Sequence, residues 1–404
     1  MDRPYAHITV TSKGERALRA GHPWVFDAEV TEVTGAPAGG DVVDIYTQKG
    51  RWLGAGFYNP VSKIRVRCFS RNANDRFDES FWRRALRYAV DYRRAVLDDA
   101  DFRCCRLIHG EADRFPGLTV DRFENVLVAE TLSLGMERIK AALFPALVDI
   151  LKECGAEIDA VYERNGSALR EKEGLPCGSG FFSGGGDGHV GICENGIYYD
   201  VDYIAGQKTG FFLDQKFNRR AIRQIAKGRR VLDCFTHTGG FGLNAAAGGA
   251  AQVTSVDVSA DALAQAEKNA ARNGLSDRID FLCADVFDLL TDMAAQGKKG
   301  DYDFIILDPP AFTKSGATVK SAFRGYKEIN LKAMKLLPRG GFLATCSCSH
   351  FMTDELFREM LRQAASDAAV ELRQVEARQQ GPDHPILWNV PETDYLKFYL
   401  FQVV

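Results

Sequence analysis

The sequence predicts an α/β protein: a seven-stranded, doubly wound, mostly parallel sheet late in the chain, preceded by a small β-barrel and an α+β segment. After residue 228, short apolar runs alternate regularly with helical patterns, which is typical of βα units. Before residue 70, short apolar runs are separated by Gly- and Pro-containing segments, as in small barrels. A chain of 404 residues also exceeds one ordinary core, so we expect two or three domains of about 100 to 200 residues each.

The first segment contributes five expected strands. The strand at residues 64–69 alternates apolar side chains with Arg65 and Arg67, so one face should be buried and the arginines should lie on the other. That face is either solvated or in contact with a phosphate backbone. The five strands lie at residues 7–10, 24–26, 42–46, 52–58 and 64–69.

The middle of the chain has a mixed texture. Apolar residues recur at helical spacing among arginines from about 79 to 100, which predicts an amphipathic linker helix. A second helix and further strands follow, and the Gly-rich stretch 183–188 is typical of a hairpin tip or connector. We place the domains at 1–72, 73–190 and 191–404. The later elements are strands at 118–123, 126–131, 158–163 and 190–203, and a helix at 136–154.

Composition excludes several classes of protein. The ten cysteines are scattered with no CxxC pair, so we expect reduced thiols and no metal site. No apolar run approaches the roughly 18 residues of a membrane span, which predicts a cytoplasmic protein. The net charge of −3 argues against a uniformly basic nucleic-acid binder, although residues 1–110 carry 18 Lys and Arg against 14 Asp and Glu. That surplus is compatible with phosphate contacts or with ordinary solvated charge.

The expected parallel sheet begins with the stretch Val231–Leu243, where an apolar run breaks on a glycine pair and restarts as an alanine-rich helix. Ligands of such sheets bind at the carboxyl ends of the strands, where a glycine turn lets them approach a helix N-terminus. Two late strands should add an antiparallel edge. The strands are expected at 230–234, 252–257, 279–283, 302–307, 341–346, 370–377 and 395–402.

Four acids stand at or just after the ends of successive strands of this sheet: Asp233, Asp257, Asp285 and Asp308. The acid after the second strand is placed to accept bonds from ribose hydroxyls, and the acid after the third to meet an adenine amino group. One such acid is usually a helix cap, but four in register predict an adenosine-type cofactor.

Together these motifs resemble the class I methyltransferases that use S-adenosylmethionine, a Rossmann-like fold. Within that class the chain is similar to the bacterial ribosomal RNA large-subunit cytosine-5 methyltransferases with an N-terminal PUA domain. The resemblance covers essentially the whole chain and rests on the stretches 21–26, 106–113, 116–121, 206–215, 233–241, 308–312, 324–330 and 347–349.

The resemblance implies large-subunit ribosomal RNA as partner and S-adenosylmethionine as cofactor. The cofactor residues that we expect are Phe212, Gln215, Asp233, Phe235, Thr238, Gly239, Gly240, Asp257, Asp285 and Asp308.

Carbon 5 of cytosine is a poor nucleophile, and an enzyme activates it by adding a thiolate to carbon 6. Cys346 and Cys348 stand at and just after the fifth strand. The resemblance aligns the nucleophile with Cys348, whereas a related family with a Thr-Cys motif would place it on Cys346. Asp308 would hydrogen-bond the ring nitrogen N3 and the exocyclic amine, and Phe312 could stack on a base removed from its helix. No general base is identified.

Two other functions remain open. The Asp-Pro-Pro-x-Phe motif is close to one that positions an exocyclic amine, so methylation of an amine or of guanine N7 without a thiol is an alternative. A non-catalytic RNA-binding protein, using the barrel and the basic helix, is the alternative from another class. The sequence leaves monomer and homodimer open.

Overall fold

The computed structural model describes residues 3–313 and 315–404, which form two compact units. The first unit contains the described residues up to Ile192, and the second begins at Cys193. Two later segments, Val201–Leu213 and Pro382–Thr393, belong to the first unit although their chain neighbours belong to the second. The chain therefore passes between the units several times.

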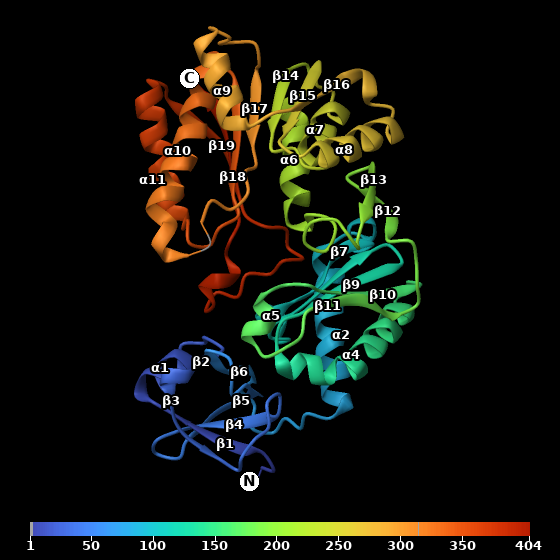
Figure 1. Ribbon diagram of the computed structural model, residues 1–404, viewed down its shortest axis with the longest axis vertical. Helices are drawn as coiled ribbons and strands as arrows, with labels where there is room; N and C mark the ends of the chain where they lie inside the picture. Colours follow the sequence, from blue (N-terminus) through green and yellow to red (C-terminus); the bar gives the residue numbers. More distant parts are fainter. Residues whose placement is uncertain (1–2, 314) are drawn as a thin grey trace. The chain divides into compact units, whose positions relative to one another are not determined.

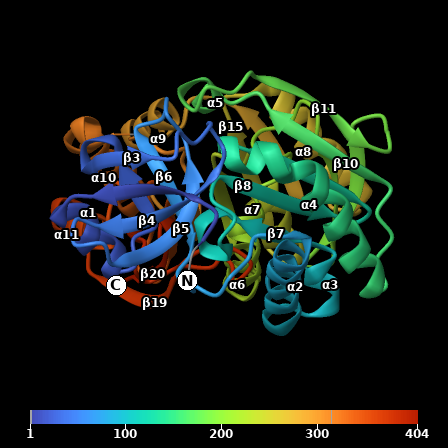
Figure 2. The same cartoon turned by 90° about the horizontal axis from the view of Figure 1, so that it is seen from below.

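A six-stranded sheet in the order β2-β6-β5-β4-β1-β3 opens the first unit. Its strands form a curved sheet (Figure 2). Alternate side chains of β1 and β4, such as Ile8 and Val10 or Val43 and Ile45, belong to its small buried core. The elements are β1 (Ala6–Val10), α1 (Ser12–Arg19), β2 (Trp24–Phe26), β3 (Val30–Thr34), β4 (Val42–Thr47), β5 (Trp52–Tyr58) and β6 (Ile64–Ser70).

The alternation predicted along β6 is present, but its arginines do not form an open charged face. Arg67 pairs with Glu111 at 3.0 Å and Glu173 at 2.9 Å, and its guanidinium lies over the ring of Trp24. Arg65 donates to the carbonyl of Asn59. These arginines are therefore internal contacts of the first unit, which the spacing alone could not reveal.

A five-stranded sheet in the order β11-β10-β9-β8-β7 completes the first unit, with α2 and α4 packed against each other. The predicted linker helix ends earlier than expected and is followed by a short separate helix. The elements are α2 (Glu79–Val96), α3 (Asp99–Phe102), β7 (Cys104–His109), β8 (Leu118–Phe123), β9 (Val126–Thr131), α4 (Leu134–Glu153), β10 (Ala160–Asn165), α5 (Leu169–Lys172) and β11 (Gly178–Ser183).

The segment Pro382–Thr393 is tied to this central part by buried hydrogen bonds. Arg93 donates to the carbonyl of Asp383 at 2.9 Å, and the backbone N–H of Arg106 donates to the Asp383 carboxylate at 3.0 Å. The first unit thus depends on residues from near the end of the chain.

The single strand expected over 190–203 is a hairpin of β12 (His189–Glu194) and β13 (Ile197–Asp202). Its turn contains Asn195 at φ 55° and Gly196 at φ 74°, which is the Asn-Gly signature of a tight hairpin turn. The chain passes from the first unit to the second within this hairpin.

The second unit is a seven-stranded sheet in the order β16-β15-β14-β17-β18-β20-β19, in which β20 runs antiparallel to both neighbours. Helices α9, α10 and α11 pack on one face and α6, α7 and α8 on the other (Figure 1). The strands are β14 (Arg230–Cys234), β15 (Gln252–Asp257), β16 (Ile279–Cys283), β17 (Phe304–Leu307), β18 (Phe342–Ser347), β19 (Leu372–Arg378) and β20 (Lys397–Val403).

The helices of the second unit are α6 (Lys216–Ala226), α7 (Gly240–Ala247), α8 (Ala260–Arg272), α9 (Val286–Ala295), α10 (Val319–Leu336) and α11 (Asp354–Ala368). The predicted fold class is confirmed. None of the ten cysteines is in a disulfide. Across residues 3–313 and 315–404, no helix is long and apolar enough to span a membrane.

Candidate functional site

The strand order reverses between β14 and β17. From β14 the chain goes outward to β15 and β16, and it then returns to place β17 and β18 on the other side of β14. All five strands are parallel, so the loops that follow them lie at the same edge of the sheet. Such a reversal point is where open α/β sheets bind ligands.

The loop from β14 to α7 has an unusual backbone. Phe235, His237 and Gly239 all have positive φ, at 65°, 51° and 91°. Gly242 is packed so closely that a Cβ there would lie 2.3 Å from Oγ of Ser255 and 2.9 Å from Oδ2 of Asp233. The turn therefore lies tightly against β14 and β15, and its backbone N–H groups begin a helix.

Asp233 is fully buried beneath this turn. Its Oδ2 accepts a hydrogen bond of 2.5 Å from the Thr236 hydroxyl, while no described residue hydrogen-bonds its Oδ1. Burial raises the pKa of Asp233 to about 7. A buried carboxyl with an unused oxygen at a strand end fits the cationic part of a ligand.

The next two strand-end acids are held by backbone N–H groups. Asp257 accepts from the N–H of His237 at 2.9 Å and of Ser259 at 3.0 Å, so it links the glycine turn to β15. Asp285 is exposed and caps α9 by accepting from the N–H groups of Phe287 and Asp288. Both carboxylates have fixed positions, and their roles toward a cofactor remain predictions.

Two further predicted cofactor residues support the turn through their backbones. The carbonyl of Thr238 accepts from the Asn269 amide at 3.1 Å, and the carbonyl of Gly240 accepts from the Asn244 amide at 2.9 Å. Phe212, in contrast, belongs to the first unit, where Lys208 Nζ lies 4.4 Å from its ring centroid. Its cofactor role stays a prediction.

Asp308, directly after β17, is in contact with two predicted site residues. Its Oδ1 accepts from Nε2 of Gln215 at 2.9 Å, and it lies beside the Cys346 thiol. Burial, with the nearby charge of Asp214, raises the pKa of Asp308 to about 6. Part of this carboxyl is therefore protonated near neutral pH.

The two cysteines differ in environment. Cys346 is fully buried in β18, and burial together with the charge of Asp308 raises its thiol pKa well above the usual value. Cys348 is only half-buried, in the loop beyond β18. A buried neutral thiol is a poor nucleophile. Cys348 is the more accessible of the two thiols, and its role as nucleophile stays a prediction.

Lys397 lies beside Cys348, and sequence reasoning missed it. Its ammonium donates to the carbonyls of Ser349 at 2.6 Å and Tyr395 at 2.9 Å. Burial lowers the pKa of Lys397 to about 8, while the charges of Asp394 and Cys348 act in the opposite direction. An ammonium held here would stabilise a thiolate on Cys348.

A buried ion pair lies beside the glycine turn at Gly240, and it was not predicted from the sequence. Arg219 on α6 binds Glu194 bidentately at 2.6 and 2.7 Å, and the Arg219 side chain packs against Gly240, where a Cβ would lie 3.1 Å from its Cδ. No sequence signal marks this pair, because its two residues are 25 positions apart.

Phe312 packs against Tyr326 at a centroid distance of 4.4 Å and against Phe287 at 5.8 Å. It therefore belongs to an aromatic cluster with Tyr326 and Phe287, beside the loop that follows β17. Whether a base stacks on it remains a prediction.

The family model described as S-adenosylmethionine-dependent methyltransferase matches residues 107–401, and a PUA-like domain model matches residues 8–71. The chain belongs to the S-adenosylmethionine-dependent methyltransferases. The cofactor of this methyltransferase is S-adenosylmethionine, and the glycine turn with the buried carboxyl of Asp233 fits it.

Curated relatives share the whole length of the methyltransferase. It is 39% identical over 405 residues to the "Ribosomal RNA large subunit methyltransferase I" of Klebsiella pneumoniae (strain 342), covering 100% of both chains. The protein of the same name from Photobacterium profundum is 42% identical, covering 95% of this chain and 96% of the relative. A solved structure from Streptococcus mutans has the same fold, with a TM-score of 0.82 at 22% identity over 98% of this chain and 100% of that chain.

Proposed function

We propose that this methyltransferase transfers a methyl group to carbon 5 of a cytosine in large-subunit ribosomal RNA, through a covalent bond between a cysteine and carbon 6. The observation that carries the proposal is the arrangement at two neighbouring parallel strand ends: Asp308 follows β17, and Cys346 and Cys348 end and follow β18. The names of the relatives and the PUA-like match support an RNA substrate.

In this proposal Cys348 is the nucleophile. Its thiolate Sγ bonds to carbon 6, and the electron pair of the C5–C6 double bond moves toward carbon 5 and the N3 side of the ring. The nearby ammonium of Lys397 favours the thiolate form. Cys346 stays a neutral thiol against Asp308 and contributes packing.

Asp308 acts as the acid. With a pKa raised to about 6, its protonated form donates to N3 as the thiolate adds, which stabilises the adduct. Gln215 holds the carboxyl in place by its hydrogen bond. Bound S-adenosylmethionine supplies the electrophilic methyl group that carbon 5 attacks. The carbon 5 proton then passes to a water molecule, the C5–C6 double bond re-forms as the Cys348 thiolate leaves, and N3 returns its proton to Asp308, which restores the aromatic ring.

Asp233 and the glycine turn would hold the cofactor. The backbone N–H groups at the start of α7 point toward the strand-end edge, and Asp257 and Asp285 stand at the neighbouring strand ends for the ribose and the adenine. Substitution of Asp233, Asp257 or Asp285 should therefore weaken cofactor binding, whereas substitution of Cys348 should abolish catalysis and leave cofactor binding intact.

The test replaces each cysteine and uses RNA containing 5-fluorocytidine. Fluorine on carbon 5 cannot leave as a proton, so the adduct between enzyme and RNA persists and migrates as a covalent species on a denaturing gel. We expect the adduct with the wild type and with Cys346→Ala, and none with Cys348→Ala.

Methyl transfer to ordinary RNA separates the alternatives. Retained transfer by Cys348→Ala would overturn the thiol mechanism and favour methylation of an exocyclic amine or guanine N7. Failure of the wild type to methylate any RNA, with S-adenosylmethionine bound, would favour a binding protein. The proposed substrate implies a cytoplasmic location. Sedimentation velocity would show whether the protein is a monomer or a homodimer, which the sequence leaves open.

A further inference from the structure

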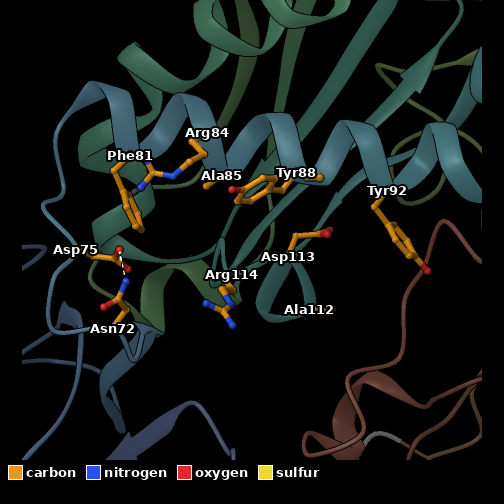
Figure 3. A pocket seen from close by; sticks show the side chains of 11 residues that line it. Asn72, Asp75, Phe81, Arg84, Ala85, Tyr88, Tyr92, Ala112, Asp113 and Arg114 are labelled. Atoms are coloured by element: carbon orange, nitrogen blue, oxygen red, sulfur yellow. Dashed lines mark hydrogen bonds between the residues drawn. The ribbon is translucent and has the colours of Figure 1, made fainter.

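One side of α2 carries a stripe of aromatic and basic residues, Phe81, Arg84, Tyr88 and Tyr92, of which Phe81 is half-buried and the other three are exposed. Their spacings of three, four and four residues place them on one helix face. They border a hollow of about 580 Å³ in the first unit. Figure 3 shows them on the side of α2 that faces Arg114 and the turn at Asn72 and Asp75.

The fold of the first unit does not account for the exposure of this stripe. The core side of α2 buries Trp82, Leu86 and Val90. The Tyr92 hydroxyl donates to the carbonyl of Pro382 at 3.0 Å, so the helix is anchored without Tyr88 and without the face of the Tyr92 ring. Tyr88 nevertheless leaves 65% of its surface accessible, and Tyr92 leaves 38%. Exposed aromatic rings grouped around a hollow are typical of binding surfaces.

The acids of the hollow are already engaged. Arg93 binds Asp113 bidentately at 2.5 and 2.7 Å. The carboxylate of Asp75 accepts from the Ser70 hydroxyl at 2.6 Å and the Asn72 amide at 3.1 Å. Asp113 thus adds little net negative charge.

The two exposed arginines of the hollow, unlike Asp113, have no ion-pair partner among the described residues. Among the described residues, neither Arg84 nor Arg114 forms an ion pair, and Arg84 lies over the Phe81 ring at 5.6 Å. On another face of the same helix, Arg83 and Arg87 both pair with Glu153. The helix therefore presents unneutralised positive charge beside its aromatic stripe.

We infer that this hollow binds a single-stranded segment of the RNA substrate, with bases stacked on Tyr88 and Tyr92 and phosphates paired with Arg84 and Arg114. Aromatic rings beside arginines are the standard platform for unpaired RNA, because every base has a face that stacks and every linkage carries a charge. A volume of about 580 Å³ lies within the range of small-ligand sites. The inference rests on the proposed function for the identity of the RNA.

The direct test titrates a dye-labelled single-stranded RNA of about ten nucleotides into the full-length protein and follows fluorescence anisotropy. We expect Tyr88→Ala to raise Kd about tenfold, because base stacking on one ring is lost. Tyr88→Phe keeps the ring and should bind like the wild type. Equal affinity of Tyr88→Ala and wild type would overturn the inference.

The arginines have a separate signature. Arg84→Gln and Arg114→Gln should each reduce the slope of log K against log salt concentration by about 0.7, the value for one phosphate contact to a single strand. Arg83→Gln is the matched control on the same helix, and its slope should equal that of the wild type. Unchanged slopes in both variants would also overturn the inference, even if Tyr88→Ala failed to fold.

Methyl transfer distinguishes this inference from the proposed function. With large-subunit ribosomal RNA as substrate, Tyr88→Ala should raise KM for RNA and leave KM for S-adenosylmethionine unchanged. If the wild type methylates cytosine and Tyr88→Ala has an unchanged KM for RNA, only the inference fails. If the wild type methylates no cytosine and Tyr88→Ala still weakens RNA binding, only the proposed function fails.

Discussion

The side-chain amide of Gln215 donates a hydrogen bond of 2.9 Å to Oδ1 of Asp308. The carbonyl oxygen of the same Gln215 amide accepts from the Asn218 amide at 2.7 Å, so the orientation of the Gln215 side chain is fixed. Asn218 stands on the first turn of α6 and Asp308 directly follows β17. A helix start and a strand end that are distant in the sequence are thus joined at the acid of the proposed reaction.

Gln215→Ala should lower kcat/KM for RNA methylation by about ten- to a hundredfold. A hydrogen bond to a charged group contributes about 1.5–3 kcal/mol, and without it the Asp308 carboxyl is free to rotate. Gln215→Glu should be worse, because an ionised carboxylate cannot donate the hydrogen bond that holds Asp308 and repels its ionised form. Gln363→Ala, on α11, is the control. A normal kcat/KM in Gln215→Ala would show that the hydrogen bond positions nothing.

Asp308→Asn should stabilise the apoenzyme at pH 8 while abolishing methyl transfer. The pKa of Asp308 is raised from its usual 3.8 to about 6, so the folded state favours the protonated form. Ionisation above pH 6 therefore costs stability, by at most about 3 kcal/mol. The advantage of the variant should shrink as the pH falls from 6 toward 4.

Urea unfolding at pH 8 and pH 5 measures this difference. Asp303→Asn is a control of opposite sign, since the hydrogen bond from Arg230 lowers the pKa of Asp303 against the effect of partial burial. It should therefore destabilise the protein at pH 8. Equal stability of Asp308→Asn and wild type at both pH values would contradict the assigned environment of Asp308.

Binding of S-adenosylmethionine should release protons between pH 5.5 and 7. Asp233 and Asp308 have pKa values raised to about 7 and about 6, and a cationic ligand favours their ionised forms. The affinity should rise with pH through this window and level off above it. S-adenosylhomocysteine lacks the sulfonium charge and should release fewer protons.

Calorimetry at pH 6 in two buffers of different ionisation enthalpy gives the number of protons released. Asp233→Asn should reduce the release by S-adenosylmethionine. Identical release with both ligands would show that neither carboxyl senses the sulfonium.

Gly242→Ala should destabilise the second unit by about 1–3 kcal/mol, the cost of overpacking a tight site. The added methyl would lie 2.3 Å from Oγ of Ser255. The double variant Gly242→Ala with Ser255→Ala removes that oxygen and should recover part of the loss. Gly316→Ala is the control, because a Cβ there has nothing within 4 Å. Thermal unfolding measures all three, and an unchanged midpoint in Gly242→Ala would contradict the close packing.

Most of the fold was predictable because the pattern repeats. Each parallel strand of the second unit is a short apolar run, and an acid or a cysteine stands at or just after its end, so topology alone brings Asp233, Asp308 and Cys346 to one edge. Lys397 and the pair of Arg219 and Glu194 were not predictable, because Ser349, beside Cys348, is 48 positions from Lys397, and Glu194 is 25 positions from Arg219. β3 escaped detection because four of its five residues are exposed, which leaves no alternation.

The hairpin at 189–202 was missed for a different reason. The apolar character of β12 and β13 masked the Asn195-Gly196 turn between them, although that dipeptide is a strong local signal. Arg67 shows what alternation cannot predict. The pattern along β6 placed Arg67 on the correct face of the strand, but it could not indicate that Glu111 and Glu173 pair with this arginine.

The return of Pro382–Thr393 to the first unit has a consequence for biosynthesis. Domains of a nascent chain generally fold in order as they leave the ribosome, but here the first unit cannot finish before residue 393 has been made. Until then Arg93 and Arg106 lack their contacts with Asp383. The two units must therefore complete their folding almost together. A protein truncated after Ile192 or after Asp200, where the first segment of each unit ends, would lack part of both folds.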